Sequence, residues 1–452
     1  MQGDSLPDGR LIAFYGDDFT GSTDVMEVLA FAGLPTVLFL DVPSPEDLAR
    51  FPEARAIGIA GTARSQSPAW MQENLAPALR ALDALQTPVL HYKVCSTFDS
   101  SPQIGSIGCA LEIGLAQTQR AWCPMVVATP ALRRYQAFGT LFAAVDGAGY
   151  RLDRHPTMSR HPVTPMHEAD LRRHLAAQTH EPIGLVDHVA LTTGQGGAAL
   201  AAARAQHRAV LFDVMDNATL AEVGRLIWAA RDGGLFAVSS SGLTYALVAH
   251  WRSAGMLLPA SPPASRGKVD RLLVVSGSCS PVSAGQIGWA VANGFAPVRL
   301  DIAAASDPVT APAEAARAAQ AACAALAAGQ DAIVFSAEGP GDASIAGLSV
   351  LASGMGRAPA DLQRHVAATL GEVAALVTSR SGLTRIVIAG GDTSGAATQR
   401  LGIQALEAVM PVAPGGPLCL GHRRGQAPVE ILLKGGQIGA VDLFGQVKRG
   451  GA

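Results

Sequence analysis

The stretch "FYGDDFTGSTDVMEVLAFAG", residues 14–33, places two adjacent acids, Asp17 and Asp18, in a glycine- and threonine-rich turn after an apolar run. One acid could cap the helix that the following pattern predicts, since Asp is a favoured N-cap residue. Capping does not need both, and two neighbouring carboxylates are costly unless cations or hydroxyl groups meet them. We therefore interpret the pair as a site for a hydroxylated ligand, in which one carboxylate orients or deprotonates an attacking oxygen.

Further polar residues of the N-terminal half also follow strand-like runs. "GIAGTARSQ" carries Arg64, and "HYKVCSTFDSS" carries Lys93, Ser96 and Asp99. Arg and Lys at strand ends suit a carboxylate or phosphate, whereas Asp and Ser suit sugar hydroxyl groups. An ordinary surface salt bridge is the alternative for Arg64 and Lys93. The combination predicts a site for a small polyhydroxy acid.

Two histidines lie in the segment "YRLDRHPTMSRHPVTPM", at His155 and His161. Taken singly, each is more simply explained as a loop histidine that bonds to backbone. Their separation is not the spacing of a zinc site. We expect no zinc ion held by protein ligands.

Three Gly/Ser-rich turns in the C-terminal half each follow an apolar run: "VVSGSCSP" (274–281), "VIAGGDTSG" (387–395) and "LLKGGQIG" (432–439). Glycine lets backbone N–H groups approach an anion, and the N-terminus of a following helix adds positive charge. Pro281 fits a first helical position, and Lys434 fits a phosphate counter-charge. Each turn alone is also a common tight turn, but together they predict a phosphate cradle. The sequence has no GxxxxGK[ST] motif, so it is not a P-loop protein.

A dehydrogenase is an alternative. "VALTTGQGGAALAAARAQHRAVLFD" has Gly194, Gly196 and Ala199 in GxGxxA spacing after a strand-like run, and Asp213 ends the next such run. This is the pattern of a dinucleotide site, although it lies in mid-domain and Gly/Ala-rich segments produce it by chance. A non-catalytic sugar-acid binding protein is a third possibility, but it would not need three Gly-rich turns.

Strand-like runs alternate with helical patterns along the chain. Residues 11–16, 22–33 and 35–41 form a strand, helix and strand unit, in which Ser22 or Thr23 caps the helix and Gly33 ends it. The same order returns at residues 271–301 and 384–403. The pattern predicts an α/β fold with mostly parallel sheets flanked by helices.

A Pro-, Ser- and Ala-rich segment, "PASPPASRGK" at residues 259–268, is the clearest linker. We therefore predict a substrate-binding domain at 1–258 and a nucleotide-binding domain at 269–452. Ligands of such sheets lie at the carboxyl ends of the strands. The active site is expected in the cleft between the domains.

Composition narrows the function classes. The 452 residues are 49% hydrophobic and 16% charged, with a formal net charge of -3, which does not favour nucleic acid or an anionic membrane as partner. Six cysteines without CxxC spacing indicate reduced thiols and a cytoplasmic location. The start shows no signal-peptide pattern, and the Ala-rich stretch 313–329 is expected to be a soluble helix rather than a membrane span.

The sequence resembles the four-carbon acid sugar kinase family over nearly its whole length. "GDDFTGSTDVMEVLAFAG", "YKVCSTFDS" and "RHPVTPM" are similar to motifs of its N-terminal domain, and "SGSCS", "GGDTSG" and "LLKGGQIG" are similar to turns of its nucleotide domain. The resemblance implies a two-domain ATP-dependent kinase that phosphorylates a primary hydroxyl of a small sugar acid, such as threonate, erythronate or 3-oxotetronate. It implies substrate contacts from Asp17, Asp18, Arg64, Lys93, Ser96 and His161. It implies ATP contacts from Ser278, Gly390, Gly391, Asp392, Thr393 and Gly435.

The implied cofactors are ATP and Mg²⁺, with Asp392 as a direct or water-mediated metal ligand. The 3-oxotetronate branch usually continues after "CSTFDS" to G-N-I-G, where this chain has "SPQIGSIG". Where that branch has P-x-N-G-R-T, this chain has "TPALRRYQAFGTLF". The sequence also looks like the 3-oxo-isoapionate kinase branch, whose substrate is a branched five-carbon acid. A homo-oligomer is left open.

Overall fold

The computed structural model describes residues 5–118, 120–261, 263–354 and 356–451. The chain divides into two compact units, residues 1–261 and residues 262–452. The division falls inside the segment 259–268. Between α9 (Gly242–Ser253) and β12 (Leu273–Ser276) the described residues form no helix or strand.

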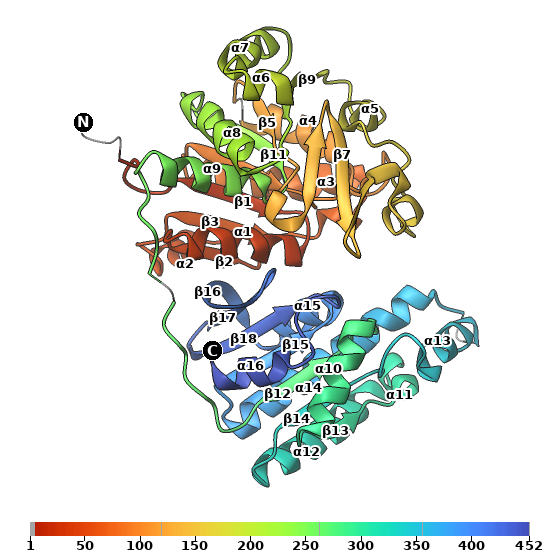
Figure 1. The fold of residues 1–452 in the computed structure, drawn as a ribbon. Coiled ribbons are helices and arrows are strands. Elements are labelled where there is room, and N and C mark those ends of the chain that lie inside the picture. Colours follow the sequence, from red (N-terminus) through yellow and green to blue (C-terminus); the bar gives the residue numbers. More distant parts are fainter. Residues whose placement is uncertain (1–4, 119, 262, 355, 452) are drawn as a thin grey trace. The chain divides into compact units, whose positions relative to one another are not determined.

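The N-terminal unit is built on a parallel sheet with the strand order β11-β4-β1-β3-β2 (Figure 1). Gly16 at the end of β1 pairs in register with Ala60 of β3 and Lys93 of β4. The three loops that carry the predicted polar residues therefore leave the same edge of the sheet. The strands are β1 (Ile12–Gly16), β2 (Thr36–Phe39), β3 (Ala56–Ala60), β4 (Val89–Lys93) and β11 (Leu235–Ser239).

Two smaller sheets complete this unit. β5 (Cys123–Met125), β10 (Ala209–Phe212) and β9 (Ile183–Val186) are parallel. β6 (Arg134–Ala137), β7 (Thr140–Val145) and β8 (Ala148–Arg151) form an antiparallel meander that the alternating pattern did not predict. The helices are α1 (Phe19–Phe31), α2 (Pro45–Ala49), α3 (Pro68–Asp83), α4 (Ile107–Thr118), α5 (Leu171–Ala176), α6 (His188–Thr192), α7 (Gly196–Gln206), α8 (Asn217–Ala229) and α9, with 3₁₀ turns at Ala63–Ser65, Pro130–Leu132, Leu152–Arg154 and Met158–Arg160.

Helix α1 begins earlier than the sequence pattern indicated. Its N-cap is Asp18, whose Oδ1 accepts the Gly21 N–H at 2.6 Å. The predicted caps were therefore wrong, because Asp18 supplies the cap first. The hydroxyls of Ser22 and Thr23 lie inside the helix and donate to backbone carbonyls. Gly33 follows the last helical turn with φ of +98°, as expected for the residue that ends a helix.

The dehydrogenase pattern is wrong in its structural context. The run before Gly194 is helix α6 and not a strand, so the glycines lie between two helices. The Asp213 carboxylate is fully buried and accepts backbone N–H groups from Phe138, Gly139 and His188 at 2.5, 2.9 and 3.0 Å. These bonds occupy the oxygens that would have to hold a ribose.

The C-terminal unit has a parallel sheet, β13-β14-β12-β15-β18, which β17 and β16 extend in antiparallel order. Ser276, Ala389 and Lys434 end neighbouring strands in register, so the three Gly-rich turns leave one edge. The strands are β12, β13 (Ala296–Arg299), β14 (Ala332–Phe335), β15 (Arg385–Ala389), β16 (Ile403–Ala413), β17 (Gly416–Arg423) and β18 (Gln426–Lys434).

Helices pack on this second sheet around a core that includes Val274, Ile333, Val387 and Phe444. Pro281 is the first residue of its helix, and the Ala-rich stretch is helical, as predicted. The helices are α10 (Pro281–Ala292), α11 (Ile302–Ser306), α12 (Ala311–Ala327), α13 (Ala343–Gly354), α14 (Pro359–Ser381), α15 (Gly391–Arg400) and α16 (Leu443–Arg449). None of the helices in the described part of the chain has the length and apolar character of a membrane span.

The α/β class with mostly parallel sheets is confirmed. The cleft between the domains stays a prediction.

Candidate active site

Backbone hydrogen bonds hold the three polar loops of the N-terminal unit together. The Asp17 N–H donates to the Lys93 carbonyl at 2.9 Å, and the Asp17 carbonyl accepts the Arg64 N–H at 3.0 Å. The Gly61 N–H donates to the Gly16 carbonyl at 2.9 Å. The loops after β1, β3 and β4 therefore form one rigid group at the sheet edge.

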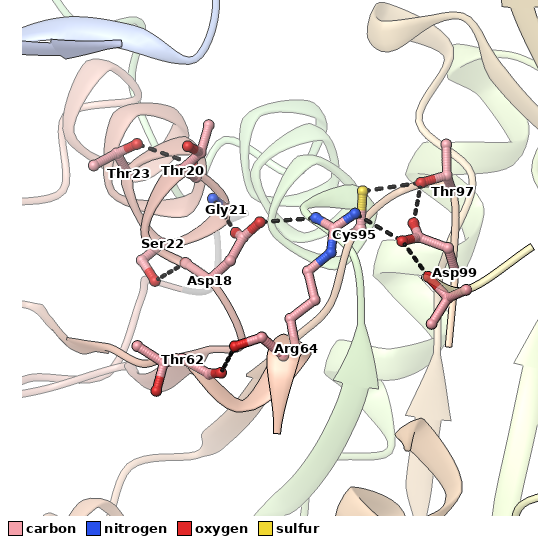
Figure 2. A network of polar contacts seen from close by, with 12 residues as sticks. Asp18, Thr20, Gly21, Ser22, Thr23, Thr62, Arg64, Cys95, Thr97 and Asp99 are labelled. Carbon is pink, nitrogen blue, oxygen red and sulfur yellow. Dashed lines mark hydrogen bonds and ion pairs between the residues drawn. The ribbon is translucent and has the colours of Figure 1, made fainter. Parts of the chain in front are cut away.

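Arg64 bridges two carboxylates that lie far apart in the sequence (Figure 2). Its Nη1 donates to Asp18 Oδ2 and its Nη2 donates to Asp99 Oδ2, both at 2.8 Å. The Asp99 side chain is only 1% exposed. Burial raises the pKa of Asp99, but the Arg64 charge and hydrogen bonds from Thr97 and Arg64 outweigh it, and the net pKa is lowered. Asp99 is therefore an ionised partner of Arg64 at neutral pH. We call Asp18, Arg64 and Asp99 the carboxylate clamp.

The clamp continues to His161 through Thr164, which sequence reasoning did not single out, and Thr97 also holds Asp99. Thr97 Oγ1 donates to Asp99 Oδ1 at 2.6 Å, and Thr164 Oγ1 lies 3.3 Å from Asp99 Oδ2. Thr164 also contacts His161 Nδ1, both from its backbone N–H and from its hydroxyl, at 3.0 Å. Both threonines belong to the quoted stretches "YKVCSTFDS" and "RHPVTPM", so the motifs held the signal.

Asp17 differs from Asp18 in its surroundings. The residue is 5% exposed, and its Oδ1 has no hydrogen-bond partner within the described residues. Burial and the neighbouring Asp18 charge raise the pKa of Asp17 to about 8, although Lys93 and Arg64 partly offset this. Asp17 is thus a carboxyl group that titrates near neutral pH, which suits proton transfer.

Lys93 is a buried cation at the end of β4, 3% exposed. A Cβ atom placed on Gly21 would lie 2.6 Å from Lys93 Nζ and 2.5 Å from Asp18 Oδ1. A side chain at this position would therefore displace the end of Lys93 or of Asp18 from beside helix α1. Burial raises the pKa of Asp24, and the Lys93 charge offsets this only in part, so the net pKa is raised. Asp24 lies one turn along the helix from Gly21 and was not among the predicted site residues.

The other predicted residues of this unit also lie near the clamp or in the same loops. Ser96 is half-buried in the loop after β4, two residues from Val94, which donates to the Ser239 carbonyl. Within the described residues, His155 makes no hydrogen bond to the clamp; its Nδ1 accepts the N–H groups of Thr157 and Met158 at 3.2 Å. This confirms the expectation that it bonds to backbone.

In the C-terminal unit, a buried lysine ends β18. Lys434 is 1% exposed, and its Nζ donates to Ser283 Oγ at 3.1 Å, which in turn donates to Ser278 Oγ at 2.9 Å. Across the described residues no carboxylate pairs with Lys434. Burial lowers the pKa of Lys434 to about 8. A buried cation without a counter-charge is an electrostatic site for an anion.

The turn before α15 presents backbone groups beside this lysine's strand. Gly390 is the N-cap with φ of +117°, a conformation that favours glycine, and no side chain caps the helix. The first N–H groups of a helix without a side-chain cap are open to a ligand. A Cβ on Gly277 would lie 2.1 Å from Thr393 Oγ1, so a side chain at this position would displace Thr393 where the first and second Gly-rich turns meet.

The three turns also meet through serine side chains. The Ser280 hydroxyl caps α10 by accepting the Ser283 N–H at 3.0 Å, and it donates to the Gly436 carbonyl. Gly435 therefore lies next to a residue that is tied to the first turn. The structure thus brings together the predicted residues Ser278, Gly390, Gly391, Asp392, Thr393 and Gly435 at one sheet edge.

No group of three or more His, Cys, Asp or Glu side chains within the described ranges is arranged to hold a metal ion. Asp392 is exposed in the first turn of α15. Its carboxylate is accessible to a cation that a bound phosphate group would also coordinate.

Comparison with known proteins agrees with this division of the residues. A family model described as a sugar-binding N-terminal domain matches residues 12–247, and one described as a nucleotide-binding C-terminal domain matches residues 273–444. The chain is similar to a 3-oxo-isoapionate kinase of Paraburkholderia graminis, with 52% identity over 98% of this chain and 95% of the relative. It is also similar to a 3-oxo-tetronate kinase of Pseudomonas savastanoi pv. phaseolicola, with 31% identity over 97% of both chains.

Solved structures show the same fold. A Salmonella typhimurium protein aligns with a TM-score of 0.79 and 26% identity over 97% of this chain and 98% of its own. A Haemophilus influenzae protein aligns with a TM-score of 0.72 and 24% identity over 96% and 98%. The two family models and the full-length relatives establish that this chain belongs to the four-carbon acid sugar kinase family.

Proposed function

We propose that this chain transfers the γ-phosphoryl group of ATP to a primary hydroxyl of a small sugar acid. 3-Oxo-isoapionate is the first candidate substrate and 3-oxotetronate is the second. The observation that carries the proposal is the Asp17 carboxyl, buried with an unpartnered oxygen and a pKa near 8, beside the carboxylate clamp. The 52% identity to a 3-oxo-isoapionate kinase favours the branched acid.

In the N-terminal unit, Asp17 is the proposed general base for the attacking hydroxyl of the substrate. In the clamp both carboxylates share one cation, since Arg64 holds Asp18 and Asp99. Arg64 thus positions two carboxylates that accept hydrogen bonds from substrate hydroxyls. Lys93 has no paired carboxylate in the described residues and is the cation we assign to the substrate's acid group. Ser96 and His161 supply further polar contacts.

In the nucleotide site, Lys434 and the turn Gly390–Gly391 hold the phosphate oxygens. Phosphoryl transfer has a loose transition state, so positioning and charge neutralisation supply most of the catalysis. Mg²⁺ would be held by the phosphate oxygens and the exposed Asp392 carboxylate, and it would neutralise charge on the β- and γ-phosphates. Ser278 and Thr393 add hydroxyl donors, and Gly435, in the third turn, is a further proposed contact.

The test is ADP release with ATP and Mg²⁺ against a panel of sugar acids: 3-oxo-isoapionate, 3-oxotetronates, threonate and erythronate. Turnover of 3-oxo-isoapionate alone is expected. It would connect the altered segments 101–108 and 130–139 to the branched substrate. Turnover of a four-carbon acid alone would keep the kinase and overturn the substrate assignment. ADP release from none of them, by folded protein, would overturn the proposal.

Six free cysteines and the use of ATP support a cytoplasmic location. Oligomeric state stays a prediction that light scattering would test.

A further inference from the structure

A cavity of about 230 Å³ lies within the C-terminal unit, at the carboxyl ends of three neighbouring strands. Gly277 follows β12, Ser336 follows β14, and Thr393 follows β15 in the first turn of α15, and all three line the cavity. Ligands of open α/β sheets bind at this edge. We call this space the base cavity.

The far wall of the base cavity is apolar. It is formed by Ile302 of α11, Ile345 of α13, and Val366 and Ala367 of α14. Val366 and Ala367 are buried, and Gln363, one turn earlier on α14, is exposed at the cavity's rim. The cavity is thus lined partly by residues of the Gly-rich turns and partly by apolar side chains of three helices.

The volume matches part of a ligand. Whole-ligand pockets usually measure about 300–1,000 Å³ and combine apolar walls with a few polar groups. The base cavity shares Gly277, Asp392 and Thr393 with the turns proposed to hold the phosphates. A ligand that spans both spaces carries a phosphate chain at one end and a flat apolar group at the other.

A larger cavity nearby, of about 650 Å³, fits a base less well. Its lining includes Arg299, Asp301, Glu314 and Arg317. Arg317 pairs with Glu314 at 2.6 Å, and Arg299 pairs with Asp342 at 2.6 Å, so its walls are charged and its charges are already matched. Ile302 lines both spaces.

We propose that the base cavity holds the adenine ring of the nucleotide, packed against Ile302, Ile345 and Val366. The Gln363 amide stands where it can meet the edge of the ring. An amide offers one donor and one acceptor, which matches the adenine N7 and N6 pair better than the two acceptors of guanine. This inference rests on the proposed kinase function and adds to it the place where the base is read.

The first experiment separates base binding from phosphate binding. Calorimetry on the full chain measures the Kd of a non-hydrolysable ATP analogue and of tripolyphosphate, both with Mg²⁺. Ala367→Leu fills the base cavity and is expected to weaken the nucleotide about tenfold or more, the usual cost of misfit in an apolar pocket. Tripolyphosphate affinity should stay unchanged. Ala368→Leu, at the next position of α14 and outside the cavity wall, is the matched control.

The outcomes distinguish the inference from the proposed function. If the wild-type chain binds neither ligand, the kinase proposal fails. If the wild type binds both and Ala367→Leu binds the nucleotide equally well, the base lies elsewhere. If Ala367→Leu loses both ligands while Ala368→Leu keeps both, the cavity only shapes the phosphate turns, and the inference is overturned.

Gln363 gives a second test that does not alter the core. Gln363→Ala removes an exposed amide, so folding should be unaffected. The preference for ATP over GTP, measured as the ratio of kcat/KM values, should fall about tenfold, since one bidentate base contact discriminates by at least that much. An unchanged preference would show that this amide does not read the base.

Discussion

The carboxylate clamp of the N-terminal unit and the three Gly-rich turns of the C-terminal unit, here called the phosphate turns, differ in how their charged side chains are paired. In the carboxylate clamp, one arginine is bound by two carboxylates at 2.8 Å, so each carboxylate has a cationic partner before any substrate arrives. In the phosphate turns, Lys434 is buried, its amine donates to the Ser283 hydroxyl, and no carboxylate among the described residues pairs with it. The first arrangement suits the proposed role of presenting hydrogen-bond acceptors to hydroxyl groups. The second gains its missing counter-charge only from a ligand, which suits a site for a polyanion.

The largest expected effect concerns Asp17, which is not part of the carboxylate clamp. Asp17→Asn removes the proposed base and should lower kcat about 10²–10⁴-fold, the usual contribution of a general base. The measurement is steady-state ADP release at saturating acid and ATP. Nucleotide affinity should not change. Asp8→Asn, which alters an exposed carboxylate of the same unit, is the control. A kcat for Asp17→Asn within about twofold of wild type would contradict a base role.

Removing the cation of the clamp tests whether its two ion pairs stabilise the fold. Arg64→Met leaves the buried Asp99 and half-buried Asp18 without their cation. We expect a loss of roughly 3 kcal/mol in the free energy of unfolding, the lower end for breaking a buried ion pair because Arg64 is partly exposed. Urea denaturation at pH 7 measures it. Arg225→Met, which breaks an exposed pair with Glu222, should cost less than about 1 kcal/mol. Equal costs would mean that the clamp acts as a surface pair.

Removing Lys434 should have the opposite pattern: ligand affinity should fall, whereas the stability of the fold should not. Lys434→Met should raise the Kd for MgATP about 10–100-fold, the value of a charged hydrogen bond, and leave the stability of the free protein unchanged or higher. Because the pKa of Lys434 is about 8, wild-type affinity should weaken as the pH rises through that value, and the variant should not show this dependence. Lys268→Met, at an exposed lysine, is the control. A destabilised variant with normal affinity would place the lysine's role in folding.

The last prediction is a pH slope in stability. The folded-state pKa of Asp17, about 8, lies above that of a carboxyl group in the unfolded chain. Between about pH 4 and 8 the unfolded chain therefore binds fewer protons, and stability falls as the pH rises by up to roughly 1.4 kcal/mol per pH unit. Asp17→Asn should reduce this slope. Denaturation at pH 5, 6, 7 and 8 measures both proteins. Parallel curves would mean that Asp17 is already ionised in the folded chain.

The sequence predicted the regular α/β elements well, because strand, turn and helix signals there are local. Pro281 and Gly33 mark the helix ends that their residue types indicate. The antiparallel meander over residues 134–151 was missed, since its short strands lack the helix that normally separates parallel ones. The run 188–192 was taken for a strand because its apolar residues are too few to show a helical period.

The candidate site was predicted as residue types but not as pairs. Asp18, Arg64 and Asp99 were each named, yet their mutual bonds depend on strand register across 81 positions of the chain, from Asp18 to Asp99. The base cavity had no sequence signal, because its walls are ordinary core residues of α11, α13 and α14. Such residues become recognisable only when the fold leaves space between them.

Gly21 limits how the neighbouring charged groups can be arranged among relatives. The ends of Lys93 and Asp18 reach into the volume that a side chain at this position would take. A relative that has replaced this glycine is therefore expected to have moved or replaced at least one of these two groups. A set of aligned relatives sorted by these three positions would test whether they change together.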